Sequence, residues 1–310
     1  MSGADRSNST SSEPAKHVSY EETAFFFPCL GESLLGIATI SEHNALLGVL
    51  IVVGGPQYRI GSHRQFVHLS RHLAACGIPS MRFDYRGMGD STGGMRTFED
   101  IQPDIRAAVD AFFARQRSLR GVVLWGLCDG ASAAAFYGKN DSRVVGLILV
   151  NPWVRTPRGE AQTYLRYYYM QRLFERSLWT KLLHGDFDVI KALRSFASAV
   201  NSAAGGKQSS ASSPVTAQPL PDRMVRDLSH YSGAMLFLLS GNDYTAKEFS
   251  DVASSSSSWR DVFARSNVRS SELADCDHTF SRKEWAEQVA NLTAEWVSSI
   301  DMRMLPSAPR

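Results

Sequence analysis

The sequence has little that would point to a metal, a nucleotide or a disulfide framework. Its 310 residues include only four cysteines, none at C-x-x-C spacing, so neither a structural zinc site nor a redox pair is indicated. The phosphate-binding pattern G-x-x-x-x-G-K is also missing. We therefore expect no metal and no cofactor.

Basic blocks and long apolar runs are also missing. The formal net charge is +2, with no cluster of lysine and arginine, so no nucleic-acid partner is expected. The most apolar run, residues 45–53, is far shorter than the roughly 20 residues of a membrane helix. The first eighteen residues lack the apolar core of a signal peptide, and residues 1–19 are predicted to be disordered. We expect a soluble cytoplasmic protein with reduced thiols and no transmembrane segment.

What the chain does have is an alternation of apolar strands and amphipathic helices. A hairpin is predicted at residues 23–27 and 33–40, and buried strands at 46–53, 78–83, 121–125, 144–150, 234–239 and 268–273. Helices are predicted between them, at 62–76, 98–115, 132–137, 245–264 and 282–302. This β-α-β order predicts an α/β fold: a mostly parallel sheet with helices on both faces, built from residues 20–154 and 229–310.

The pattern changes over residues 155–228. Two aromatic-rich helices are expected at 161–183 and 187–200, followed by a Ser/Ala/Gly-rich loop at 201–221. We predict a helical cap over the carboxyl edge of the sheet, because open α/β sheets bind ligands there. The alternative is that these are ordinary helices packing on the sheet, with their tyrosines half in the core.

Residues 126–131 (GLCDGA) are the most informative segment. They follow an apolar strand and open an alanine-rich helix, with a glycine two residues on either side of Cys128. This is the G-x-S-x-G nucleophile elbow with sulfur in place of the hydroxyl. A helix N-terminus favours a thiolate, and the N–H of Asp129 would point at an oxyanion. The alternative is a small apolar residue buried at a strand end.

A thiol nucleophile needs a base, and the base needs an orienting carboxylate. In this kind of fold they follow the nucleophile in the order acid, then histidine. Asp243 follows the strand at 234–239, and His278 lies on the loop before the last helix. Asp243 could instead be a turn aspartate that binds its own backbone, and His278 a helix-capping or surface residue. Other candidates in range fit the strand ends less well: Asp251, Asp275 and His230.

Several further runs carry a resemblance to a known family. They are residues 54–59 (GGPQYR), 61–64 (GSHR), 83–91 (FDYRGMGDS), 125–132 (WGLCDGAS), 151–155 (NPWVR) and 277–280 (DHTF). The D-x-R-G-x-G-x-S pattern resembles the α/β-hydrolase superfamily. Together the runs resemble the exosortase A system-associated hydrolase 1 family, whose genes lie beside bacterial exopolysaccharide and protein-sorting genes. The resemblance covers roughly residues 22–300 and implies a cysteine α/β-hydrolase, but no particular physiological substrate.

The oxyanion hole needs a second backbone donor from the loop after the strand at 46–53. Pro56 has no N–H, so Gly55 or Gln57 must supply it, and Gly55 is favoured because its bare backbone permits close approach. A carboxylate at position 129 is unfavourable beside an oxyanion unless it turns away or pairs with a cation. The candidate cations are Arg59, Arg64 and Arg86.

The predicted reaction is attack by Cys128 on an ester, thioester or related carbonyl, with His278 as base and Asp243 holding its tautomer. The substrate would be a small acyl compound or a glycolipid-like molecule. The residues expected to contact it are Tyr58, Arg59, Trp153, Tyr164 and Tyr168. Two alternatives stay open: an acyltransferase with the same triad, because thioesters react readily with amines, and a non-catalytic binding protein on the same fold.

Overall fold

A computed structural model describes residues 19–41, 44–55, 57–154, 218–301 and 305. The predicted tail at 1–18 and most of the predicted cap, with Tyr164 and Tyr168, lie outside these residues, so both stay predictions. No helix in the described part of the chain is long and apolar enough to cross a membrane.

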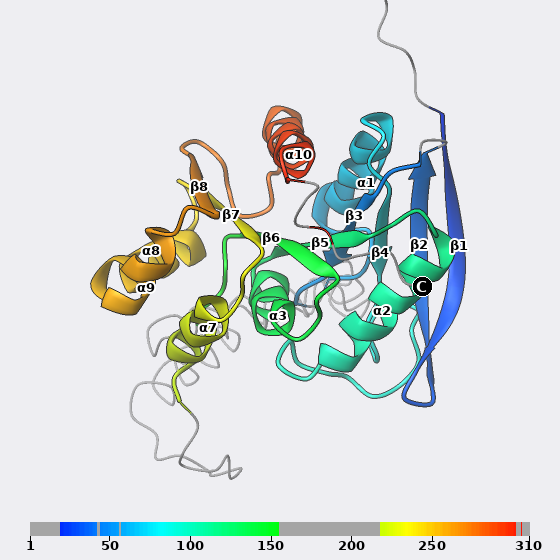
Figure 1. The fold of residues 1–310 in the computed structure, drawn as a ribbon, viewed down its shortest axis with the longest axis horizontal. Helices are drawn as coiled ribbons and strands as arrows, with labels where there is room; N and C mark the ends of the chain where they lie inside the picture. Colours follow the sequence, from blue (N-terminus) through cyan, green and yellow to red (C-terminus); the bar gives the residue numbers. More distant parts are fainter. Residues whose placement is uncertain (1–18, 42–43, 56, 155–217, 302–304, 306–310) are drawn as a thin grey trace, which may run out of the picture.

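The core of the molecule is one eight-stranded sheet (Figure 1). Its order is β1-β2-β4-β3-β5-β6-β7-β8, with β1, β2 and β4 paired antiparallel and every pair from β4 to β8 parallel. The predicted hairpin and mostly parallel sheet are confirmed. The strands are β1 (Tyr20–Cys29), β2 (Glu32–Ser41), β3 (Leu47–Val52), β4 (Ser80–Phe83), β5 (Gly121–Leu127), β6 (Val144–Val150), β7 (Ala234–Ser240) and β8 (Val268–Leu273).

The sheet separates two apolar cores, as the unbroken apolar run of β3 predicts. Leu50 and Val52 face one core, while Val49 and Ile51 face the other. Helices cover both faces (Figure 1). On one face lie α1 (Gln65–Ala75) and α10 (Lys283–Ser298), and on the other α2 (Gln102–Arg115), α3 (Asp129–Gly138) and α7 (Leu220–Ser229). The strands β3, β5 and β6 are buried along their whole length, which is why they carry no polar alternation.

Three local expectations differ from the structure. The range predicted as cap and loop ends in α7, whose apolar stripe packs Met224 and Leu228 into the core beside α3. The helix predicted at 245–264 is two helices, α8 (Tyr244–Ser255) and α9 (Ser257–Phe263), because Ser256 in the serine run is extended. The helix predicted at 62–76 begins later, with α1 at Gln65, and the Ser62 hydroxyl accepts from the Gln57 side chain at 3.1 Å.

The parallel strands bring distant loops to one edge of the sheet. Because β3 to β8 run in the same direction, the segments after β3, β4, β5, β6, β7 and β8 all leave at their carboxyl ends. All the sequence runs with candidate chemistry follow one of these ends. The fold therefore gathers them on one side of the molecule.

Candidate active site

Cys128 lies at a sharp bend between β5 and α3. Its backbone has φ 60° and ψ −124°, a region that residues with a Cβ rarely adopt, at a cost of about 1–3 kcal/mol. The thiol is partly exposed, whereas Cys29 and Cys276 are buried. The strained bend raises the side chain at the carboxyl edge of the sheet, as the elbow pattern predicts.

The two flanking glycines are required because the backbones approach closely. A Cβ on Gly126 would lie 2.4 Å from the carbonyl group of Gly130, and one on Gly130 would lie 2.5 Å from the carbonyl oxygen of Val52. Neither glycine has a positive φ, so the unusual backbone angle belongs to the cysteine itself. The glycines let α3 start against β3 and β5.

His278 and Asp243 form a hydrogen-bonded pair. Nδ1 of His278 lies 2.7 Å from Oδ2 of Asp243, and both side chains are largely buried. A carboxylate only accepts, so Nδ1 carries the proton and Nε2 is left as an acceptor. Asp243 also caps α8, accepting from the N–H groups of Thr245 at 3.3 Å and Ala246 at 3.1 Å. One side chain therefore binds both the backbone of its own turn and the His278 ring.

Asn151, which follows β6, ties the loops of the site together. Its Oδ1 accepts from the N–H of Ser240 at 2.8 Å, and its Nδ2 donates to the Ser240 hydroxyl at 2.9 Å and to the His278 carbonyl at 3.4 Å. One residue earlier, the Val150 carbonyl accepts from the N–H of Cys128 at 2.9 Å. No role for Asn151 or Ser240 follows from the sequence; its signals were the place of Asn151 in the run at 151–155 and the polar residue that ends each of these apolar strands.

The Asp129 carboxylate is held by backbone donors. The N–H of Gly55 donates to Oδ2 of Asp129 at 2.7 Å. Burial raises the pKa of this carboxyl from 3.8 to about 6, while hydrogen bonds from the N–H groups of Gly55, Asp129 and Gly130 act in the opposite direction. Of the candidate arginines, none forms an ion pair with Asp129 in the described residues.

Two of the three candidate arginines, Arg59 and Arg86, are engaged elsewhere. Arg59 pairs with Asp84 at 2.5 Å and with Asp90 at 2.6 Å, so its guanidinium holds the loops after β3 and β4 together. Arg86 forms an ion pair with buried Asp104 at 2.8 Å. The structure thus places Arg59, predicted to contact substrate, in a bridge between loops.

Two other residues predicted to contact substrate, Tyr58 and Trp153, lie on the loops after β3 and β6. Tyr58 is 44% exposed, and its ring is 5.7 Å from the Arg59 guanidinium. Trp153 is half-buried; its N–H donates to the Cys128 carbonyl at 3.3 Å, and its carbonyl accepts from the Ser132 hydroxyl at 2.7 Å. Trp153 therefore lies beside the backbone of the candidate nucleophile.

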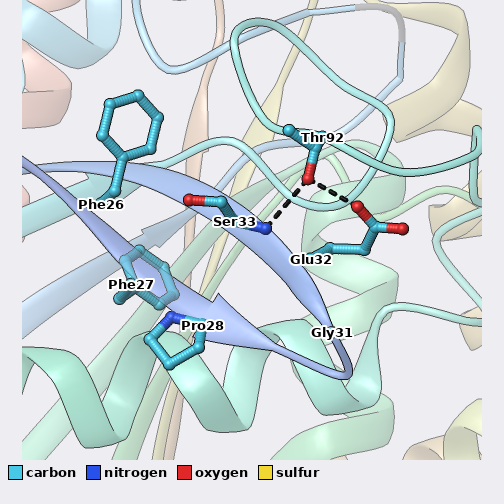
Figure 2. Close-up of a pocket in the computed structure, with 7 residues that line it drawn as sticks. All are labelled: Phe26, Phe27, Pro28, Gly31, Glu32, Ser33 and Thr92. Atoms are coloured by element: carbon cyan, nitrogen blue, oxygen red, sulfur yellow. Dashed lines mark hydrogen bonds between the residues drawn. The ribbon is translucent and has the colours of Figure 1, made fainter.

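A surface hollow of about 300 Å³ lies at the β1–β2 hairpin (Figure 2). Thr92 is one of the residues that line it. The Thr92 hydroxyl donates to the Glu32 carboxylate at 2.6 Å and accepts from the Ser33 N–H at 2.9 Å. None of the predicted site residues lines this hollow.

Among the described residues, no group of three His, Cys, Asp or Glu side chains is arranged to hold a metal. His68 and His72 stand four residues apart on α1, a spacing that can serve metal binding, but no third ligand joins them in that part of the chain.

Comparisons with known proteins agree with this architecture. Residues 48–245 match the family model described as serine aminopeptidase, S33. The esterase Pf2001 of Pyrococcus furiosus has a TM-score of 0.62 at 14% identity, covering 96% of this chain and 99% of its own. Est1E of Butyrivibrio proteoclasticus, solved with ferulic acid, has a TM-score of 0.59 at 14% identity, with coverages of 89% and 99%.

A dienelactone hydrolase of Anabaena variabilis has a TM-score of 0.57 at 14% identity, with coverages of 91% and 98%. At such identities the likeness is one of fold, and that fold is the α/β-hydrolase fold. No curated protein matches the chain.

Proposed function

Because the chain belongs to the serine aminopeptidase S33 family of α/β-hydrolases, we propose that it is a hydrolase with Cys128 as nucleophile, His278 as base and Asp243 as the orienting carboxylate. The observation that carries the proposal is the His278–Asp243 pair on the loops after β7 and β8, at the edge where the strained Cys128 elbow also lies. Asn151 supports it, because this side chain bonds the His278 backbone and follows the residue that accepts from Cys128.

The proposed reaction proceeds through a covalent thioester. His278 Nε2 takes the thiol proton as Sγ of Cys128 attacks the acyl carbon, and the carbonyl oxygen becomes an oxyanion. The oxyanion collapses, the leaving alcohol or thiol takes the proton from His278, and the acyl group stays on sulfur. Water, deprotonated by His278, then attacks the thioester, and Cys128 leaves as a thiolate that regains its proton.

The sulfur sets this chain apart from the description of its family, which names a serine. A thiolate is a better leaving group than an alkoxide, so the second step can use acceptors other than water. Hydrolysis is the proposed activity, and acyl transfer to an amine or hydroxyl is the other outcome that product analysis distinguishes.

The finer context is also part of the proposal. The sequence runs that resemble the exosortase A system-associated hydrolase 1 family are hydrogen-bonded to one another around the site. Residues 54–59 bond to the run at 83–91 through Arg59 and Asp84, and to the elbow through Gly55 and Asp129. We therefore place the substrate among small acyl or glycolipid-like compounds of bacterial exopolysaccharide metabolism. A reducing cytoplasmic setting suits the free thiols of all four cysteines.

The test is acylation by an activated aryl ester, followed by intact mass. Cys76 is exposed, so the experiment uses a Cys76→Ser background. Burial raises the pKa of Cys29 and Cys276 above that of an ordinary thiol, so these two are poor nucleophiles. We expect one acyl adduct, absent in Cys128→Ala. His278→Ala should lower the acylation rate by about 10²–10⁴-fold. An adduct that persists in Cys128→Ala, or full turnover without the thiol, would defeat the covalent scheme.

A further inference from the structure

The oxyanion hole expected from the sequence already holds an oxygen atom. Its two predicted donors are the backbone N–H groups of Gly55 and Asp129. In the structure the N–H of Gly55 donates to Oδ2 of Asp129 itself, at 2.7 Å. The N–H groups of Asp129 and Gly130 also act to lower the pKa of this carboxyl, against the effect of its burial. Backbone donors at the start of a helix bind anions, and here the anion belongs to the protein.

The surrounding backbone is shaped to admit this carboxylate. A Cβ on Gly54 would lie 2.1 Å from Oδ1 of Asp129 and 2.4 Å from the nitrogen of Gly130. Position 54 therefore has to be glycine for the side chain to lie where it does. The carboxylate is buried to 8% exposure in the resulting space.

A substrate cannot use these donors while the carboxylate holds them. Each N–H points along one direction, so a carbonyl oxygen that enters the hole has to take the place of a carboxylate oxygen. We propose that the Asp129 carboxylate is the resting occupant of the oxyanion hole and that the substrate carbonyl must displace it before Cys128 can react. This inference rests on the proposed function, because it takes Cys128 to be the nucleophile.

The charges around Asp129 make displacement dependent on its protonation. Three titratable groups face it in the described residues: Cys128 on the elbow, Tyr85 after β4 and His278 on the loop after β8. The Tyr85 hydroxyl donates to the Gly55 carbonyl at 3.3 Å. Burial raises the pKa of Tyr85, so this phenol is neutral. A protonated Asp129 accepts hydrogen bonds more weakly than a carboxylate and leaves the hole more easily.

The kinetic test compares Asp129→Ala, which empties the hole, with Asp129→Asn, which keeps an accepting oxygen without charge. At about pH 8 we expect kcat/KM for an aryl ester to rise about tenfold or more in Asp129→Ala and less in Asp129→Asn. The ratio of Asp129→Asn to wild type should fall toward one below about pH 6, because the wild-type carboxyl is then protonated and uncharged, as the amide is. Lower kcat/KM in both variants, with melting curves that show folded protein, would overturn the proposal.

A second measurement needs no catalysis. With glycine labelled by ¹⁵N in a Cys128→Ala background, the Gly55 amide signal should move with pH about a midpoint near 6. It should stay constant in the same background with Asp129→Asn. A Gly55 signal that does not titrate refutes the occupied hole even if Cys128 is acylated. If the Gly55 signal titrates but the wild-type protein forms no acyl adduct, the carboxylate does occupy the hole. That combination of results refutes the proposed function instead.

Discussion

Replacing Asp129 by asparagine should make the protein more stable at neutral pH. The wild-type carboxyl is buried beside backbone donors without a cation, and its pKa is raised from 3.8 to about 6. A raised pKa means that the folded state binds the proton more tightly than the unfolded state. The stabilisation is therefore fully present below about pH 3.8 and lost as the pH rises through about 6.

The size of the effect follows from the two pKa values. One pKa unit corresponds to about 1.4 kcal/mol, so complete ionisation of Asp129 lowers the free energy of unfolding by about 3 kcal/mol. Over the experimentally easier range from about pH 5 to about pH 7.5, the linkage relation gives roughly 1.4 kcal/mol. Asparagine at this position does not titrate and still offers an oxygen to the Gly55 N–H.

Urea denaturation of both proteins at several pH values measures the difference directly. The free energy of unfolding of Asp129→Asn minus that of wild type should increase by the stated amount between about pH 5 and pH 7.5, with equal m-values. All other titrating groups are common to both proteins and cancel. A difference that is constant over this range, or that decreases with pH, would show that the carboxyl has an ordinary or lowered pKa and that its burial is not as described.

Three further predictions concern the elbow and its supports. Cys128→Gly should unfold with a free energy about 1 kcal/mol higher than Cys128→Ala, because only glycine adopts φ 60° without strain; equal urea midpoints would refute the strain. Asn151→Ala should lose about 1–3 kcal/mol of stability, since it leaves the buried N–H of Ser240 without a partner, although the Ser240 hydroxyl keeps its bond to the Asp277 carbonyl. It should also lower kcat more than it raises KM; unchanged denaturation would contradict this. Asp243→Ala should lower the free energy of unfolding by about 1 kcal/mol through the lost α8 cap, and kcat by roughly 10⁴-fold. Asp243→Asn should keep most of the cap and lose a similar factor in kcat. Full activity of either variant in ester turnover would exclude the orienting role.

The elbow and the acid–histidine pair were predictable because each has a short-range signal. Gly126 and Gly130 mark the bend within five residues. Asp243 follows the apolar strand β7, and His278 lies on the loop between the short, polar strand β8 and the last helix. Parallel strands end at a common edge, so residues after different strands could be expected to lie on one side before any coordinates were known. The 2.7 Å contact between His278 and Asp243 agrees with that expectation.

The sequence by itself determined the order of strands and helices, the two-sided burial of the sheet and the place of the elbow, because these depend on periodicity and on glycines close together in the chain. Only the tertiary structure decided what the polar side chains bind. Gly55 and Asp129 are 74 residues apart, and Asn151 and Ser240 are 89 apart. The packing of the loops decides such partners, because a displacement of about 1 Å makes or breaks a hydrogen bond. The order of residues in the chain does not predict displacements of this size. That is why the arginines expected near Asp129 pair with Asp84, Asp90 and Asp104 instead, and why the carboxylate lies among backbone N–H groups.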